Sequence, residues 1–331
     1  MVMSMVQGRT WHAGEPARSD FPLVELSELL ADPENLVWVD LVEPEPELLA
    51  TLAEELQLDR HAVEDAVAPF ERPKATRHAG HVFLTCYATA LTIDPEQGPQ
   101  LSTPRISAFV LPNGLITIRS GEFDFDEVQQ RWADDGQLGH GVGALVHGML
   151  DTVVDGHFDA IQALDDEVEG LEDMLFGDAV RPRAFQQRVF GVRKVLAQLR
   201  RKVLPMREVV SAVIRFRTSE TLPVARELDG DFDDLYDHVI RAADWSESLR
   251  EVVGNAFETS LSLQDARLND IMKKLAAWAA IIAVPTAVTG WFGQNLPYPG
   301  YNTGFGVALS VGLILVGAAG LYLLFRKVDW L

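Results

Sequence analysis

Carboxylates are the side chains best placed for chemistry in this sequence of 331 residues. Asp and Glu number 49 against 28 Lys and Arg, so the formal net charge is −21 with His neutral. This excess favours cations as partners and argues against nucleic acid, because phosphate contacts need surplus Lys and Arg. The range Asp151 to Asp178 holds ten acids and no Lys or Arg. Such a run is typical of a solvated helix face, and it could also concentrate cations.

Two histidines and the single cysteine form a second candidate group. His78 and His81 lie three residues apart with Cys86 nearby, a spacing that can bind Zn²⁺. In a strand-like segment these side chains need not face the same way, so the spacing does not settle the matter. A single cysteine excludes an internal disulfide and fits a reducing compartment. No Walker A, G-x-G-x-x-G or Ser/His/Asp spacing is present in the sequence, so we do not expect an enzyme.

Two uncharged apolar stretches lie in the last sixty residues. Leu275 to Phe292 has 18 residues and Gly304 to Phe325 has 22. Crossing ~30 Å of hydrocarbon takes about 20 helical residues, so the second stretch predicts a membrane span. The first is shorter and contains Pro285, but its basic flanks also favour a span. A buried hairpin in a soluble core would explain the matched flanks poorly.

The flanking charges predict the topology. Lys273 and Lys274 precede the first span, Arg326 and Lys327 follow the second, and the loop 293–303 between them has neither Lys nor Arg. Positive residues remain in the cytoplasm, so both termini are expected there, with the short loop outside. The first residues lack the pattern of a secretory signal. We therefore expect a multi-pass protein of the inner (plasma) membrane.

The first 150 residues alternate between strand and helix patterns, which predicts an α/β or α+β domain. We expect a helix over Pro46 to Leu58 and a hairpin turn at Asn113-Gly114. Strands are expected at Leu36 to Leu41, His81 to Ile93, Arg105 to Leu111 and Gly114 to Arg119.

Helical patterns dominate from about residue 140. The acidic run is followed by Arg181 to Arg217, which has eleven basic residues and one acid, so the two helices should pair as an antiparallel hairpin joined near Gly177. No proline interrupts the chain between Pro223 and Pro285, which predicts one helix from about Phe232 to Phe292. Two seven-residue series suggest close helix contacts along it. They are Ala242, Leu249, Ala256 and Leu263, and Val239, Ser246, Val253 and Ser260.

One face of the first span carries mainly small residues. They recur at alternating steps of three and four: Met272, Ala276, Ala279, Ala283, Thr286, Gly290 and Gly293. The stripe could line a narrow pore or form a close helix–helix seam. Two spans cannot enclose a polar path alone, so a conducting form must be an oligomer.

The residues that follow this stripe resemble a known family. Gly293-Gln294-Asn295 ends the first of two C-terminal spans, where the CorA-type divalent-cation channels have Gly-Met-Asn. Other segments are similar to the family's stalk, cytoplasmic domain and C-terminus. These are Tyr236-Asp237-His238, Ser262-Leu263-Gln264, Arg267 to Lys273, Glu71 to Lys74, Asp165 to Glu169 and Asp329-Trp330-Leu331.

The resemblance implies a homopentameric, funnel-shaped channel whose first span lines the pore. Its usual cargo is Mg²⁺, often with Co²⁺ or Ni²⁺, and no organic cofactor is implied. By position, Gly293, Gln294 and Asn295 would form the selectivity filter, and Asp234 would belong to an intersubunit site for regulatory Mg²⁺. The pore lining would comprise Asn269 at the inner mouth, Met272 and Leu275 as the hydrophobic constriction, Ala279, Ala283, Thr286 as a deeper polar ring, and Gly290.

The chemistry of the filter residues agrees with this role. Mg²⁺ holds its water tightly, and neutral amide oxygens can accept hydrogen bonds from that water without stripping it or trapping the ion. Alternatively, Asn295 only caps the span and orders the loop. Gln294 replaces the usual Met and leaves the ion preference open. A zinc-transporting relative of the same architecture, or a non-conducting membrane-anchored divalent-ion sensor, therefore remains an alternative.

The predicted fold class is an α+β cytoplasmic domain followed by a long stalk helix and two C-terminal transmembrane helices. Seven segments follow from these patterns: 1–150, the α/β domain; 151–222, the acidic and basic hairpin; 223–274, the stalk; 275–292, the first span; 293–303, the outer loop; 304–325, the second span; and 326–331, the tail.

Overall fold

The structure is a computed structural model that describes residues 6–94, 98–134, 136–176, 182–219, 222–294, 297 and 300–331. It divides into two compact units, Met1–Asn255 and Ala256–Leu331. Helix α7 (Asp229–Phe292) runs through the boundary between them. The seven segments expected from the sequence stay a prediction of domain organisation.

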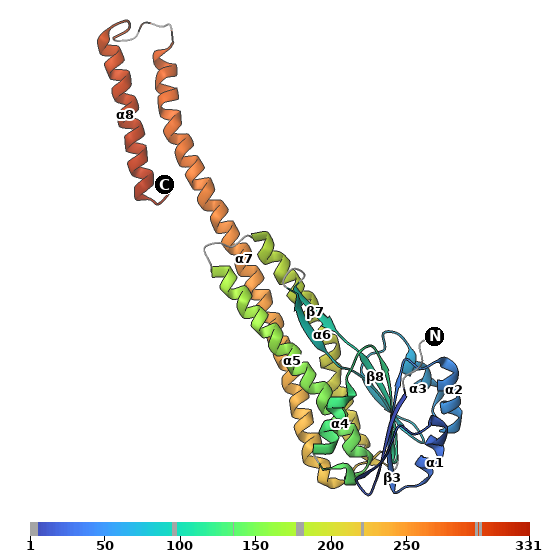
Figure 1. Cartoon of the computed structure of the whole chain (residues 1–331). Coiled ribbons are helices and arrows are strands. Elements are labelled where there is room, and N and C mark those ends of the chain that lie inside the picture. Colours follow the sequence, from blue (N-terminus) through green and yellow to red (C-terminus); the bar gives the residue numbers. More distant parts are fainter. Residues whose placement is uncertain are drawn as a thin grey trace. The chain divides into compact units, whose positions relative to one another are not determined.

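A seven-stranded mixed sheet organises the first unit (Figure 1). Its strand order is β2-β1-β3-β9-β8-β5-β4, and β3 and β9 are its parallel neighbours, with Val39 opposite Ile116. The strands are β1 (Val6–His12), β2 (Glu15–Ser19), β3 (Asn35–Val42), β4 (Lys74–Arg77), β5 (Val82–Tyr87), β8 (Arg105–Leu111) and β9 (Gly114–Ser120). Two small pairs lie outside this sheet: β6 (Ala90–Asp94) with β7 (Gly98–Ser102), and β10 (Thr218–Ser219) with β11 (Leu222–Pro223).

Helices cover both faces of the sheet because the strand residues alternate between two apolar cores. In β3, Leu36 and Trp38 enter one core, whereas Val37 and Val39 enter the other. The second core is covered by α1 (Leu26–Ala31), α2 (Pro46–Glu55) and α3 (Arg60–Val67), and the first by α4 (Phe125–Asp134), α5 (Val142–Phe176), α6 (Pro182–Phe216) and the start of α7. The α+β class and the long helix are as the sequence predicts, with α7 beginning three residues earlier than expected.

An ion pair links the two oppositely charged hairpin helices, which also share an apolar core. The guanidinium of Arg188 on α6 donates to both carboxylate oxygens of the nearly buried Glu167 on α5, at 2.9 to 3.0 Å. The join near Gly177 lies outside the described residues. Along α7 both seven-residue series are buried except Leu263, which is 36% exposed.

Three local expectations were wrong in detail. The strand expected over His81 to Ile93 is two strands, and the chain is joined to α5 between them: His157 Nε2–H donates to the carbonyl of Tyr87 at 2.8 Å, and Thr89 Oγ1 donates to the carbonyl of Gly156 at 2.8 Å. The helix expected to reach Leu58 ends at Glu55, and α3 follows with Asp59 as its N-cap. The hairpin turn is also one residue earlier than expected, because Leu111 pairs directly with Gly114.

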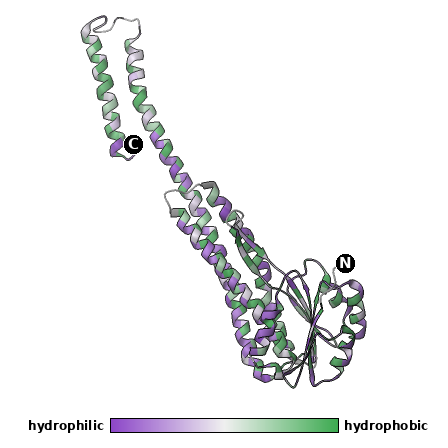
Figure 2. Cartoon of the chain, viewed as in Figure 1, coloured by the Kyte–Doolittle hydropathy of each residue, from purple (hydrophilic) through white to green (hydrophobic). Residues whose placement is uncertain are grey.

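The second unit pairs the end of α7 with α8 (Gly304–Lys327). Both helices are long and apolar enough to cross a membrane, and Figure 2 shows hydrophobic residues dominating α8 and the C-terminal part of α7. Thr303 caps α8 by accepting a hydrogen bond from the backbone N–H of Gly306. This unit holds the predicted ion pathway.

Candidate functional site

One face of the apolar part of α7 packs against α8. The contact is close at Gly317 on α8, where an added Cβ would lie 2.9 Å from Val284 Cγ1. The α7 residues that are buried or half-buried recur at helical spacing: Ala277, Ala280, Ile281, Val284, Pro285, Val288 and Phe292. This face is therefore already occupied in a single chain.

The predicted pore residues lie on the remaining surface of α7. In a single chain they are all exposed: Asn269, Met272, Leu275, Ala276, Ala279, Ala283, Thr286, Gly290 and Gly293. Relative to Val284, a turn of about 100° per residue places their average direction well away from α8. The small-residue face is thus free to meet lipid, water or other copies of the chain.

Two threonine hydroxyls near Pro285 have acceptors within the helix. Thr286 Oγ1 donates to the carbonyl of Ile282 at 3.0 Å. Thr289 Oγ1 donates to the carbonyl of Pro285 at 2.7 Å. Pro285 itself has no N–H to donate to the carbonyl of Ile281. Helix α7 nevertheless continues through Pro285 to Phe292.

The predicted outer end of the pathway follows the end of α7 at Phe292. The N–H of Gly293 donates to the carbonyl of Thr289 at 2.8 Å, and Gln294 remains exposed. Asn295, the third residue of the predicted filter, lies outside the described residues.

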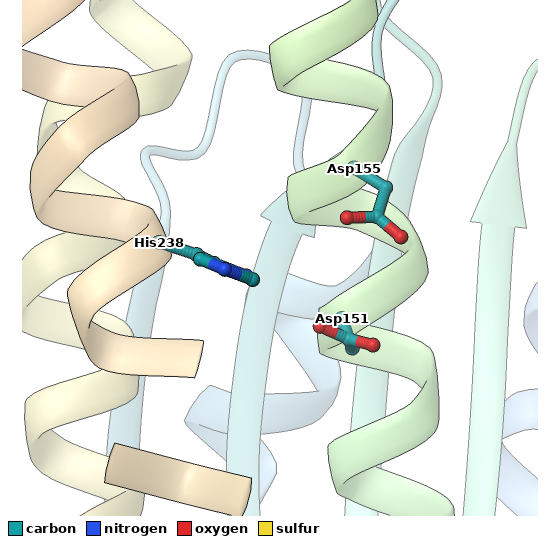
Figure 3. A group of neighbouring side chains, drawn as sticks. All are labelled: Asp151, Asp155 and His238. Carbon is teal, nitrogen blue, oxygen red and sulfur yellow. The ribbon is translucent and has the colours of Figure 1, made fainter. Parts of the chain in front are cut away.

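A cluster of possible metal ligands lies in the first unit (Figure 3). Asp151 and Asp155 are one turn apart on α5, His238 extends towards them from α7, and ligand atoms of all three lie within 4.8 Å of one another. Arg131 on α4 pairs with both carboxylates, at 2.6 Å from Asp155. Burial raises the pKa of Asp151 despite the charge of Arg131. A metal ion would therefore compete with a guanidinium for this position.

Asp234 lies beside this cluster, yet it points largely into solvent. Its side chain is 69% exposed, and Oδ2 is 3.7 Å from Nε2 of His238. The sequence pattern predicts Asp234 as a metal ligand but does not identify the cluster of Asp151, Asp155 and His238. The only sequence signal for the cluster is the four-residue spacing of Asp151 and Asp155 within the acidic run, since Arg131 and His238 come from distant segments.

The His78, His81 and Cys86 group does not come together. The two imidazole rings stack with centroids 4.9 Å apart, but Cys86 faces the opposite core, because it follows His81 by an odd number of strand positions. Burial raises the pKa of the Cys86 thiol to about 12. The thiol is therefore a core side chain and not a zinc ligand with these histidines.

Comparison with known proteins identifies the family of this chain. A model described as CorA-like Mg²⁺ transporter protein matches residues 33–327. The chain belongs to this family. It is thus a member of the CorA family of divalent-cation transporters, as the motifs around Gly293 suggested.

Individual CorA relatives support the assignment over the whole chain. The cobalt/magnesium transport protein CorA of Methanocaldococcus jannaschii is 25% identical over 93% of this chain and 95% of its own. The protein of the same name from Thermotoga maritima is 27% identical over 81% and 76%. The complete structure of the CorA magnesium transporter from M. jannaschii has the same fold, with a TM-score of 0.77 at 22% identity over 100% of both chains.

Proposed function

We propose that this CorA-family chain forms a homopentameric pore for passive uptake of Mg²⁺, with Co²⁺ and Ni²⁺ as further cargo. The observation that carries the proposal is the exposed small-residue face of α7 on the side away from α8. Five such faces around an axis would line a narrow path, with α8 outside them in the lipid. Both termini would lie in the cytoplasm of an inner (plasma) membrane protein, because the basic residues flank the cytoplasmic ends.

Selection would take place at the outer end of α7. Gly293, Gln294 and Asn295 of each copy would form a neutral ring that binds the waters of a hydrated ion. Thr286 would form a second polar ring deeper in the path, and Met272 and Leu275 would form a hydrophobic constriction. Asn269 would then lie at the inner mouth.

The membrane potential would drive entry. Moving one elementary charge through 100 mV releases about 2.3 kcal/mol, so a divalent ion gains about twice that amount. The path requires no nucleotide hydrolysis.

Cytoplasmic Mg²⁺ would regulate the pore through Asp234. Its carboxylate is exposed in the single chain and therefore available to a neighbouring copy. Mg²⁺ bridging such carboxylates would hold the copies together in a closed state, and its loss would shift the population towards open states. His238 connects Asp234 to the Asp151 and Asp155 cluster.

The decisive experiment removes the filter amide. In proteoliposomes with an imposed voltage, Asn295→Ala should lower Mg²⁺ flux by about tenfold or more, because each ring position loses its hydrogen-bond acceptor. Asn302→Gly is the matched control in the same loop, since Asn302 has a φ of 60° that glycine adopts freely. Native mass spectrometry should find five times 36.6 kDa for every variant. Unaltered Mg²⁺ flux in Asn295→Ala would refute the role of Asn295 in ion selection.

Zinc transport is the second candidate, because Gln294 stands where CorA channels have Met. The cytoplasmic domain of ZntB from Vibrio parahaemolyticus shares the fold, with a TM-score of 0.60 at 12% identity over 80% of this chain. Flux of Mg²⁺, Co²⁺, Ni²⁺ and Zn²⁺ compared in the same liposomes separates the two. A non-conducting divalent-ion sensor would show metal-dependent stability without any flux.

A further inference from the structure

A basic cavity lies in the first unit, away from the carboxylates described above. Its volume is about 760 Å³, and its walls are the loop before β4, one face of α6 and the end of the first unit's part of α7. Six cationic side chains line it: Arg72, Arg193, Arg200, Arg201, Lys202 and Arg250. Among the described lining residues the acid is Glu71. This concentration of positive charge occurs in a chain whose net charge is −21.

The nearby carboxylates do not neutralise the cavity. Glu71 is held by Lys74 at 3.0 Å, outside the set of six. Glu247 is shared between Arg200 at 2.7 Å and Arg250 at 2.6 Å, so one carboxylate serves two guanidinium groups. Burial lowers the pKa of Lys202, and the charge of Arg201 beside it lowers that pKa further. Arg72 and Arg201, together with two guanidinium groups that share the one carboxylate of Glu247, therefore leave the cavity positively charged.

The rim of the cavity carries an exposed aromatic ring. Phe70 is 96% exposed and has a φ of 69°, a left-handed backbone that a bulky side chain rarely adopts. The loop behind it is anchored, because the hydroxyl of Tyr87 donates to the carbonyl of Glu71 and Pro73 is buried. The backbone of this loop is thus held at the edge of a charged cavity, and the ring of Phe70 faces solvent.

We propose that this cavity binds a nucleotide, with its polyphosphate on the arginines and its base stacked on Phe70. A guanidinium group can donate two parallel hydrogen bonds to the oxygens of a phosphate. An aromatic side chain can stack on any nucleobase. The volume falls within the range of small-molecule sites, about 300–1,000 Å³. Such a ligand would join α6, α7 and the loop before β4, three parts of the chain that meet at this cavity.

Equilibrium binding to the full chain in detergent tests the proposal. ATP and tripolyphosphate serve as probes in EDTA, so that binding through a metal ion is eliminated. The double variant Arg72→Ala/Arg201→Ala should lose about tenfold or more in affinity for both probes, because phosphate oxygens lose charged donors. Arg207→Ala, an exposed position of α6 outside the cavity, should bind as the parent does. Phe70→Ala should weaken ATP binding and leave tripolyphosphate binding unchanged.

Two results would overturn the proposal. The first is no ATP binding to the parent; if the double variant then also changes the oligomeric mass, the cavity is a contact between copies. The second is equal ATP affinity in the parent and the double variant. Equal loss of both probes in Phe70→Ala would overturn the contact with the base. All the substituted side chains are exposed, so thermal unfolding should match the parent.

Discussion

Two histidines are held inside the cores of the first unit. His157 on α5 is 1% exposed, and its Nε2–H donates to the carbonyl of Tyr87 at 2.8 Å. His81 is 2% exposed and packs against Phe109. Burial lowers the pKa of each imidazole from 6.5 to about 4. The folded protein therefore binds fewer protons than the unfolded chain between these two values.

This difference in proton binding predicts that acid destabilises the folded protein. Stability should be fully present above pH 6.5 and should fall by roughly 2 kcal/mol per buried histidine on going from pH 7.5 to 5. His157→Gln should reduce the dependence by about one histidine's share, as measured by thermal unfolding at both pH values. His61→Gln, at an exposed position, is the control. A parent-like pH slope in His157→Gln would contradict the prediction.

Single residues could be named from the sequence only where a local motif surrounds them, and the roles expected of those residues stay predictions. Gly293 and Asp234 could be named because a known pattern surrounds each in the sequence. Arg131 could not, since its partners Asp151 and Asp155 are 20 and 24 residues away and come together only when α4 packs on α5. The same reason hid the cavity beside Phe70, whose cationic residues come from three separate segments.

Helices and strands could be predicted well where the sequence itself marks the residues at which they begin and end. Helix α7 could be predicted to within three residues, because no proline lies between Pro223 and Pro285 and the apolar run after it continues to Phe292. The break between β5 and β6 could not be predicted, because the contacts found there join Thr89 and Tyr87 to α5 residues 67 and 70 positions away in the sequence. Such tertiary contacts are absent from any short window of sequence.

The pairing of α7 with α8 gives a prediction at this scale. Gly317→Val should destabilise the second unit by about 1–3 kcal/mol, because its side chain would overlap Val284. Gly320→Val is the matched control on α8, since an added Cβ at Gly320 meets nothing within 4 Å. Thermal unfolding in detergent measures both variants. Equal midpoints for the two would show that the contact at Gly317 does not hold the helices together.

The exposed face of α7 gives a second prediction. Met272→Gly should raise the resting leak of proteoliposomes, because a wider and less apolar constriction wets more easily. Ile271→Gly costs the helix the same backbone entropy, but its position is turned about 100° around α7. It should therefore leave the leak at the parent level. Identical resting conductance in all three proteins would remove Met272 from the constriction.

At the scale of the whole molecule, charge and ions are linked. Each copy carries −21, so assembled copies repel one another unless cations screen or bridge their carboxylates. Binding that is specific for the assembled state adds stability in proportion to ion occupancy. In the proposed assembly, magnesium should therefore act as a ligand as well as a cargo.

Metal removal tests this link. Exchange of Mg²⁺ for EDTA should lower the thermal midpoint of the parent, and a ligand at a hundred times its dissociation constant contributes about 2.7 kcal/mol. Asp234→Ala should lose most of that dependence, because a bridging carboxylate is missing from each copy. Asp233→Ala, the exposed neighbour on α7, should behave as the parent. If Asp234→Ala responded to EDTA as strongly as Asp233→Ala, the stabilising ions would bind elsewhere, and the Asp151, Asp155 and His238 cluster would be the next position to substitute.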